Sequence, residues 1–354
     1  MLAPDLCYRA LKSRDPRFDG RFFTGVHSTG IFCRPVCPAV TPRREHCQFF
    51  ASAAAAIRSG FRPCLRCSPE VSPDAPAWNG TSATVTRALR LIGEGALDEA
   101  SLDGLAARLG VGARHLRRLF DEQVGASPVS VALARRVFFA KRLMTQTTLP
   151  LTQIALASGF RSIRRFNDAF RSAFQRAPRE IRRLAGEPSA SIEIKLVFRP
   201  PYDWKGVLAF LAAHAAPNRE VVRDGEWIRR LLAPAGPGSI RVRFRGDHLA
   251  ARIEIQEVRL LRDCVCRLER VFDLGADPAR IAEQLGRAAF PGIRVPGAWD
   301  DAAGKGMHAL RVLRDPDVYP AVALGLPDPG PRAEAWRPWR AYAAMSEWRK
   351  RYAR

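Results

Sequence analysis

Two close pairs of cysteines constrain the fold more than any other feature of this sequence. Three residues separate Cys33 from Cys37 and two separate Cys64 from Cys67, with 26 residues between the pairs. One pair alone could be half of a disulfide, half of a metal site or a reactive thiol. Two pairs let two short turns each supply two thiolates to one tetrahedral ion. The spacing therefore predicts a four-cysteine site for one Zn²⁺ ion as cofactor.

The chain shows no sign of export or of membrane insertion. The first 15 residues lack the apolar core of a signal peptide, and the longest apolar stretch, residues 207–216, is too short to span a bilayer. We therefore expect a cytoplasmic protein without a membrane partner, whose eight cysteines stay reduced. Cys47 is expected to be a buried apolar residue, and Cys264 and Cys266 are expected to be structural.

The charge balance points to a polyanionic partner. The chain of 354 residues holds 57 Lys and Arg against 35 Asp and Glu, a net charge of +22. Such an excess lowers the free energy of any polyanion near the surface, and nucleic acid is the leading candidate. The alternative is an arginine-rich genome, since most of the basic residues are Arg.

Composition divides the chain into four blocks, and we expect a multidomain α+β protein. The blocks are a small zinc-bound α/β domain (1–75), an all-α double helix-turn-helix domain (82–186), a small α/β domain (190–276) and a short helical remnant (277–354). A linker rich in Pro and Ser, residues 68–82, separates the first two. Alternating and helical patterns in the third block predict strands at 192–199, 239–246 and 248–256 and helices at 204–215 and 258–272.

The first block resembles the N-terminal domain of the Ada family of bacterial adaptive-response proteins. The resemblance covers residues 14–70 and rests on the segments FDGRFFTGVHSTGIFCRPVCPA and FFASAAAAIRSGFRPCLRC. It implies a zinc site whose first cysteine, Cys33, also accepts a methyl group, with Cys37, Cys64 and Cys67 completing the coordination. The implied substrate is a methyl phosphotriester in double-stranded DNA, and Arg34 beside the acceptor is expected to contact that DNA. The alternative is an inert zinc knuckle.

Electrostatics gives this implied reaction a physical reason. Four thiolates on Zn²⁺ carry a net charge of −2, which repels ordinary phosphates, whereas a methylated phosphate has lost its charge and can approach. Transfer of the methyl group leaves a thioether and a site of −1. The reaction is therefore stoichiometric, and it also acts as a charge switch that favours DNA binding afterwards.

The second block contains two helix-turn-helix units. In each, an alanine and a glycine stand at the positions for close packing and for the turn: Ala106 and Gly110 in residues 101–123, Ala155 and Gly159 in residues 150–174. Between residues 82 and 186 there are 18 basic and 8 acidic residues. The side chains left facing outward on the recognition helices, and so expected to contact DNA, are Arg114, His115, Arg117, Arg118, Arg161, Ser162, Arg164, Arg165 and Asn167.

The pattern from Gly159 to Phe170, followed by Ala177-Pro178-Arg179, resembles the AraC family of DNA-binding domains. The resemblance implies a transcriptional activator on promoter DNA, with RNA polymerase as a partner, in a bacterial cell and associated with the nucleoid. The alternative is a solvated basic pair of helices. Ada-family proteins join a zinc domain and this kind of domain in the same order.

The third block resembles AlkA, a 3-methyladenine DNA glycosylase. Residues 192–215 and 271–300 resemble the start of its small α/β domain and the approach to its catalytic helices. The phosphate-binding hairpin of that family is missing, and Ala323 stands where the catalytic aspartate is expected. Asp315, Asp317 and Asp328 lie at the wrong offset. We therefore expect glycosylase activity to be lost, with a working DNA-3-methyladenine glycosylase as the alternative function.

Overall fold

The computed structural model describes residues 2–72, 83–182, 192–232, 236–286, 289–297, 299, 324, 326–337 and 339–352. The chain divides into two compact units, which are described one at a time. The first unit comprises residues 1–189 and 258–263, and the second comprises residues 190–257 and 264–354. None of the described helices is long and apolar enough to cross a membrane.

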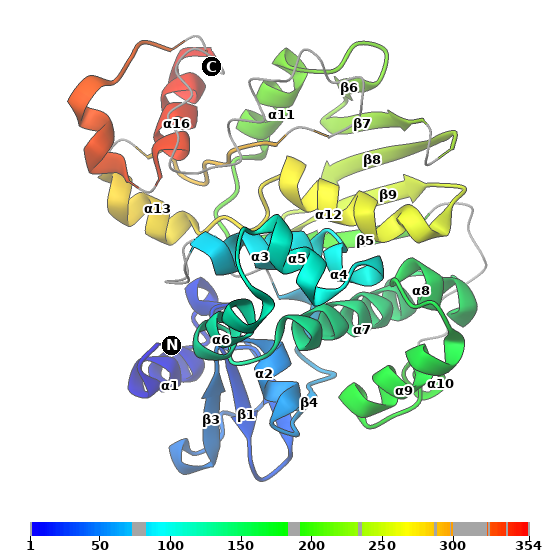
Figure 1. Ribbon diagram of the computed structural model, residues 1–354. Helices are drawn as coiled ribbons and strands as arrows, with labels where there is room; N and C mark the ends of the chain where they lie inside the picture. Colours follow the sequence, from blue (N-terminus) through cyan, green and yellow to red (C-terminus); the bar gives the residue numbers. More distant parts are fainter. Residues whose placement is uncertain are drawn as a thin grey trace. The chain divides into compact units, whose positions relative to one another are not determined.

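The first unit begins with a small zinc module, defined here as residues 2–72. Its elements are α1 (Pro4–Ser13), η1 (Pro16–Phe18), β1 (Phe23–Val26), β2 (Ile31–Cys33), η2 (Arg44–His46), β3 (Cys47–Phe50), α2 (Ala53–Arg58), β4 (Arg62–Pro63) and η3 (Pro69–Val71). The strands form one sheet in the order β3-β1-β2-β4, in which β2 and β4 run parallel. The sheet and its helices are shown in blue in Figure 1.

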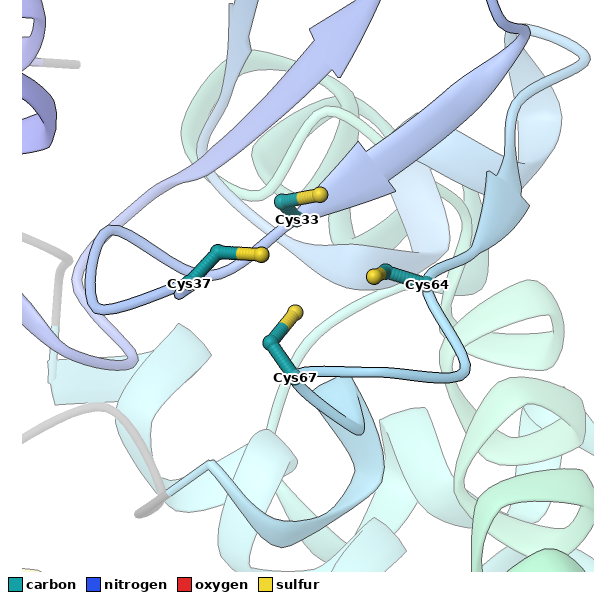
Figure 2. A group of neighbouring side chains, drawn as sticks. All are labelled: Cys33, Cys37, Cys64 and Cys67. Atoms are coloured by element: carbon teal, nitrogen blue, oxygen red, sulfur yellow. The ribbon is translucent and has the colours of Figure 1, made fainter. Parts of the chain in front are cut away.

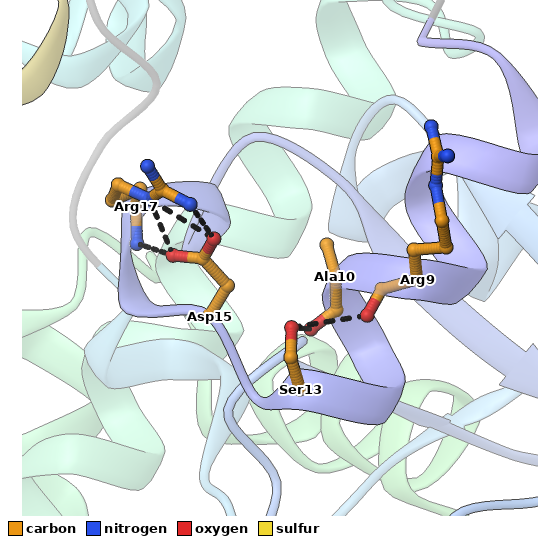
Figure 3. A network of polar contacts seen from close by, with 5 residues as sticks. All are labelled: Arg9, Ala10, Ser13, Asp15 and Arg17. Carbon is orange, nitrogen blue, oxygen red and sulfur yellow. Dashed lines mark hydrogen bonds and ion pairs between the residues drawn. The ribbon is translucent and has the colours of Figure 1, made fainter.

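Local hydrogen bonds end the first helix and start the next turn. The Ser13 hydroxyl donates to the carbonyl oxygens of Arg9 (3.0 Å) and Ala10 (3.3 Å), and the Asp15 N–H also donates to the Ala10 carbonyl at 3.0 Å. Two residues on, the Asp15 carboxylate accepts from the Arg17 backbone and side chain, as Figure 3 shows. The Arg17 guanidinium holds the pKa of Asp15 below its usual value. These contacts fix the path from α1 into the sheet.

The rest of the first unit is helical, as the sequence predicts. Its helices are α3 (Ala83–Gly93), α4 (Ala96–Glu99), α5 (Leu102–Arg108), α6 (Ala113–Gln123), α7 (Pro128–Gln146), α8 (Leu151–Ala157), α9 (Ile163–Phe174) and α10 (Pro178–Ile181). Serines begin three of them: Ser101, Ser127 and Ser162 each accept a backbone N–H of the first turn. Ser127 begins the long α7, which lies among the other helices of this unit (Figure 1).

The zinc module and the first helix-turn-helix share one hydrophobic core. Phe23, Phe32 and Phe61 of the module belong to the same buried cluster as Leu116 and Phe120 of α6. Two polar contacts cross the same boundary: the Ser52 hydroxyl donates to the Val124 carbonyl (2.8 Å) and Arg58 pairs with Asp121 (2.9 Å). Packing therefore makes the metal-binding and helical segments one body. The sequence had suggested a linker between them, and its residues 73–82 lie outside the described part of the chain.

The second unit is built on a five-stranded antiparallel sheet in the order β5-β9-β8-β7-β6. Its described elements are β5 (Ile192–Val197), α11 (Trp204–Ala213), β6 (Glu220–Arg223), β7 (Glu226–Leu231), β8 (Gly238–Phe244), β9 (His248–Glu254), α12 (Leu261–Val271, whose first three residues belong to the first unit), α13 (Pro278–Leu285), η7 (Gly330–Trp336) and α16 (Arg340–Tyr352). The strands predicted at 192–199, 239–246 and 248–256 are present, and β6 and β7 were not predicted. The helix predicted from residue 258 begins as a 3-10 turn, η4 (Val258–Leu260).

Candidate metal centre and nucleic-acid interface

Parallel pairing of two strands brings the two cysteine pairs together. Strand β2 ends at Cys33, and Cys64 follows β4 directly. Phe32 of β2 is in register with Pro63 of β4, and the Cys64 N–H donates to the Phe32 carbonyl at 3.0 Å. The first cysteine of each pair therefore lies at the same end of the sheet. A tight turn then returns the second cysteine of each pair toward the first.

The four sulfurs of Cys33, Cys37, Cys64 and Cys67 all lie within 4.8 Å of one another. Figure 2 shows them directed at a common centre. A zinc ion with tetrahedral Zn–S bonds of about 2.3 Å separates its sulfurs by about 3.8 Å, so the cluster has the size that the ion requires. The predicted zinc site is confirmed, and the described residues contain no second cluster of metal-ligating side chains.

The protonation of the cluster shows why it suits a divalent cation. Hydrogen bonds with Cys33 and the other two thiols lower the pKa of Cys64, whereas hydrogen bonds with Cys37 and the other two thiols raise the pKa of Cys33. The pKa of Cys37 is lowered to about 7, chiefly by its contact with Cys33. The sulfurs thus share protons, because several thiolates so close together repel one another. A bound Zn²⁺ replaces those protons and allows all four to ionise.

Cys33 differs from the other three sulfur ligands in exposure. It is half-buried, whereas the other three are buried. Three sulfurs accept a backbone N–H: Cys37 from Ala39, Cys64 from Cys67, and Cys67 from Arg34. Cys33 is therefore the ligand whose sulfur a substrate can reach most easily.

Arg34 has a structural position beside the metal centre. Its guanidinium pairs with Asp19 and donates to the Cys67 carbonyl at 3.2 Å, and only 12% of its side chain is exposed. Its backbone N–H donates to the Cys67 sulfur at 3.4 Å. The sequence predicts a DNA contact for this residue. In this structure its guanidinium binds within the zinc module and joins the two cysteine turns. The DNA contact stays a prediction.

Sequence reasoning missed a buried ion pair that joins the metal centre to the helices. Lys141 of α7 pairs with Glu70 and donates to the Ser68 hydroxyl at 2.9 Å, next to the last zinc ligand. The side chains of Lys141 and Glu70 are 5% and 1% exposed. The one available signal was a lysine in the otherwise apolar segment VFFAKRLM. It did not identify its partner, which lies 71 residues away.

Both predicted helix-turn-helix units are present, as α5–α6 and α8–α9. Gly110 and Gly159 occupy the two turns with φ angles of 70° and 81°, where a side chain would be strained. Ala106 and Ala155 are buried where the two helices of each unit meet. The glycine and alanine positions chosen from the sequence therefore serve the turns and the packing.

Most of the predicted DNA-contacting side chains are exposed on the second helix of each unit. The exposed residues are Arg114, His115, Arg117, Arg118, Arg161, Ser162, Arg164 and Arg165, and Asn167 is half-buried. Ser162 also has a structural role, because its hydroxyl accepts the Arg165 N–H at 3.2 Å and caps α9. The inward residues Leu116, Phe120, Phe166 and Phe170 are fully buried. A basic surface is therefore presented by both helices.

The C-terminal residues considered for glycosylase chemistry are only partly described. Ala323, Asp315 and Asp317 lie outside the described residues. Asp328 is exposed and accepts the Gly330 N–H at 2.9 Å, as a turn residue does. Trp339 and Trp348 are 5% exposed and pack in an apolar cluster with Phe210, as expected of tryptophans that cover apolar surface. Cys47 and Cys264 are buried and Cys266 is half-buried, in keeping with structural roles.

Three family models match the chain. Residues 6–70 match the metal binding domain of Ada, residues 105–184 match a helix-turn-helix domain, and residues 193–300 match the AlkA N-terminal domain. The predicted resemblances are thus confirmed for all three segments, in the predicted order.

Individual relatives agree with these matches. A Mycobacterium tuberculosis protein named "Probable bifunctional transcriptional activator/DNA repair enzyme AlkA" is 40% identical over 311 residues, 84% of this chain and 63% of that protein. The Escherichia coli "Bifunctional transcriptional activator/DNA repair enzyme Ada" is 39% identical over 127 residues, 36% of this chain and 34% of that protein. A crystal structure of the methylated N-Ada/DNA complex is 36% identical, with a TM-score of 0.20, and covers 38% of this chain and 98% of its own. This chain therefore spans less than two thirds of the curated relatives it matches first.

Proposed function

We propose that this chain, which joins a metal-binding domain of the Ada type to a helix-turn-helix domain, repairs methylated DNA by methylating itself at Cys33 and then regulates transcription. One observation carries the proposal: of four cysteines gathered at a metal site, one sulfur is accessible, and it belongs to the same compact unit as two exposed basic helices. The names of the M. tuberculosis and E. coli relatives, which combine transcriptional activation with DNA repair, support it.

The chemistry requires one bond to form and one to break. When bound, zinc supplies the charge that keeps the four sulfurs as thiolates at neutral pH. The Cys33 sulfur attacks the methyl carbon of a phosphotriester, the carbon–oxygen bond breaks, and its electron pair stays on the phosphate oxygen. The products are a methyl thioether on Cys33 and an ordinary phosphodiester, so each protein molecule reacts once.

The same reaction changes the charge of the site. The thioether sulfur carries no charge, so the metal centre goes from −2 to −1 and repels the newly restored phosphodiester less than before. The methylated protein is therefore expected to hold promoter DNA more tightly through its recognition helices. In this proposal residues 1–75 sense damage and residues 82–186 bind DNA, while 190–276 and 277–354 form an AlkA-like domain and its remnant. We place it at the bacterial nucleoid, in the cytoplasm, with RNA polymerase as a further partner.

A duplex with one synthetic methyl phosphotriester tests the proposal. After incubation with the zinc-loaded full chain, intact-mass measurement should show one added methyl group per protein molecule and no further gain with excess DNA. An unmodified duplex is the control. A protein of unchanged mass would reduce the site to an inert zinc knuckle.

A second duplex, containing 3-methyladenine, tests the alternative function. The match of residues 193–300 to the AlkA N-terminal domain is the observation that favours a DNA-3-methyladenine glycosylase. Because no catalytic carboxylate stands at the expected position, we expect no abasic sites above the level of a buffer control. Robust base release would show that the glycosylase function persists.

A further inference from the structure

The five-stranded sheet of the second unit carries mainly polar and charged side chains on one of its two faces. The register puts alternate side chains of all five strands on each face. One face holds buried residues such as Ile194, Val242 and Trp227, and Trp227 meets Phe272 at the end of α12. The other face, called here the open sheet face, carries Glu193, Lys195, Val197, Val221, Arg223, Glu226, Ile228, Arg230, Ser239, Arg241, Arg243, His248, Ala250, Arg252 and Glu254.

The open sheet face is basic. Six of its residues are Lys or Arg and three are Glu, a net charge of +3. All six basic side chains are exposed. Some are neutralised within the face: Arg243 pairs with Glu226 at 2.5 Å, and Arg252 lies 3.8 Å from Glu254. No described residue forms an ion pair with Arg241, which lies on the central strand β8.

Two arginines face each other at the centre of the open sheet face. Arg241 of β8 and Arg252 of β9 are directly opposite each other in the register. Like charges at directly opposed positions of neighbouring strands destabilise a sheet. Arg252 also faces Glu193 of β5 on its other side and lies near Glu254, whereas Arg241 has no ion pair among the described residues. An anion that lies across both arginines would supply the missing negative charge.

We propose that the open sheet face binds the phosphate backbone of double-stranded DNA without regard to sequence. Neighbouring β-strands lie about 4.8 Å apart, so their arginines form a flat array of hydrogen-bond donors. Such an array can reach several phosphates of one DNA strand. The register places no Phe, Tyr or Trp side chain on this face, so the face offers no platform for stacking a run of unpaired bases. This surface is separate from the recognition helices and would hold the chain on DNA of any sequence.

The test compares a sheet variant with a control of equal charge change. The sheet variant is R241T/R252T, since threonine suits a strand. The control is R332T/R351T, which changes two exposed arginines of η7 and α16 in the same unit. Binding of the full chain to a random duplex is measured by fluorescence anisotropy at several salt concentrations. The sheet variant should lose about tenfold in affinity near 0.1 M salt, and its slope of log affinity against log salt should flatten by about 1.8, because two phosphate contacts disappear.

Two further measurements separate binding from folding. Thermal unfolding of R241T should match or exceed that of the wild type, because the substitution removes a like-charge contact. The charge-conserving R241K/R252K should keep most of the salt slope. The proposal is overturned if R241T/R252T keeps the wild-type affinity and slope, or loses only as much as the control. Loss of binding to polyglutamate without loss of binding to DNA would also overturn it, in favour of an acidic protein partner.

These outcomes do not depend on self-methylation. The experiment uses unmethylated random DNA and variants in the second unit, whereas the proposed repair reaction depends on Cys33 in the first. A chain that fails to accept a methyl group can still show the altered salt slope, and a normal methyl acceptor can fail to show it.

Discussion

Four of the six cysteines of the first unit converge on one point, whereas the two cysteines of the second part of the chain, Cys264 and Cys266, lie on one helix outside any described metal-ligating cluster. Arginine shows a similar division. The arginines at 164 and 165 on α9 are exposed, but Arg229 and Arg294 in the second unit are each 1% exposed. Arg294 donates to backbone carbonyls, including that of Pro201 at 3.0 Å, and lies over the Tyr202 ring. Burial thus decides whether a given cysteine or arginine side chain can take part in a reaction or bind a partner.

The cysteines offer the largest contrast. Replacement of Cys64 with Ser removes a zinc ligand, and structural zinc contributes on the order of 10 kcal/mol or more to the folding of such small modules. C64S should therefore lack zinc and lose the folded zinc module, as seen by metal analysis and by circular dichroism. C264A removes one small buried sulfur and should cost about 1 kcal/mol with full zinc content. Equal zinc content in the two variants would contradict the assignment of Cys64 as a zinc ligand and of Cys264 as a structural residue.

The second largest effect on stability is expected from the buried ion pair between the zinc module and α7. K141M leaves the Glu70 carboxylate buried without its partner, which should lower the free energy of unfolding of the first unit by about 3–5 kcal/mol. The double variant K141M/E70L removes both charges and should recover most of that loss. Chemical denaturation of the zinc-loaded protein measures both. A double variant as unstable as K141M would mean that the loss comes from packing rather than from the stranded charge.

The recognition helices can be tested by removing their exposed arginines. R164A/R165A removes two exposed side chains of α9, and each contact to DNA is expected to be worth about 1–3 kcal/mol, a loss of tenfold or more in affinity for a preferred promoter. The matched variant R114A/R117A changes α6 in the same way. Titration of labelled duplexes at fixed salt gives both values. If neither pair of substitutions weakens binding, the exposed helices are not the DNA-binding surface.

The smallest effect concerns a buried acid in the second unit. Burial raises the pKa of Asp273 from 3.8 to about 6, although its carboxylate accepts from the Val295 N–H and the Tyr342 hydroxyl. Because the folded state holds this proton more tightly than the unfolded state, the contribution to stability grows as the pH falls from about 6 toward 4 and is lost as the pH rises through 6. Between pH 6.5 and 5 the wild type should gain about 1 kcal/mol relative to D273N. Parallel pH dependences in the two proteins would contradict this.

The sequence predicted what depends on short spacing. The intervals between cysteines identified the metal ligands, because each pair needs only one turn. The glycines at 110 and 159 identified the two turns of the helical region, because few other residues adopt a positive φ there. The alternation in the third block identified the strands whose inner side chains are uniformly apolar, such as β5 with its buried Ile192, Ile194 and Leu196.

Contacts between distant segments could not be predicted in this way. The pair of Lys141 with Glu70 joins residues 71 positions apart, and the pair of Arg34 with Asp19 buries an arginine that the sequence predicts to contact DNA. Strand β7 was missed because Arg229 points inward, where it pairs with Glu220 and interrupts the apolar alternation. In each case a charged side chain is buried beside its partner, and only the fold shows which partner it has.

The central claim is that one sulfur among the four ligands accepts the methyl group. Its most direct test is peptide mapping of the full chain after reaction with a methyl-phosphotriester duplex, with fragmentation to locate the added mass. We predict a single methylated residue, Cys33, at one methyl per protein molecule, with Cys37, Cys64 and Cys67 unmodified. A methyl group on any other cysteine, or none at all, would contradict the account.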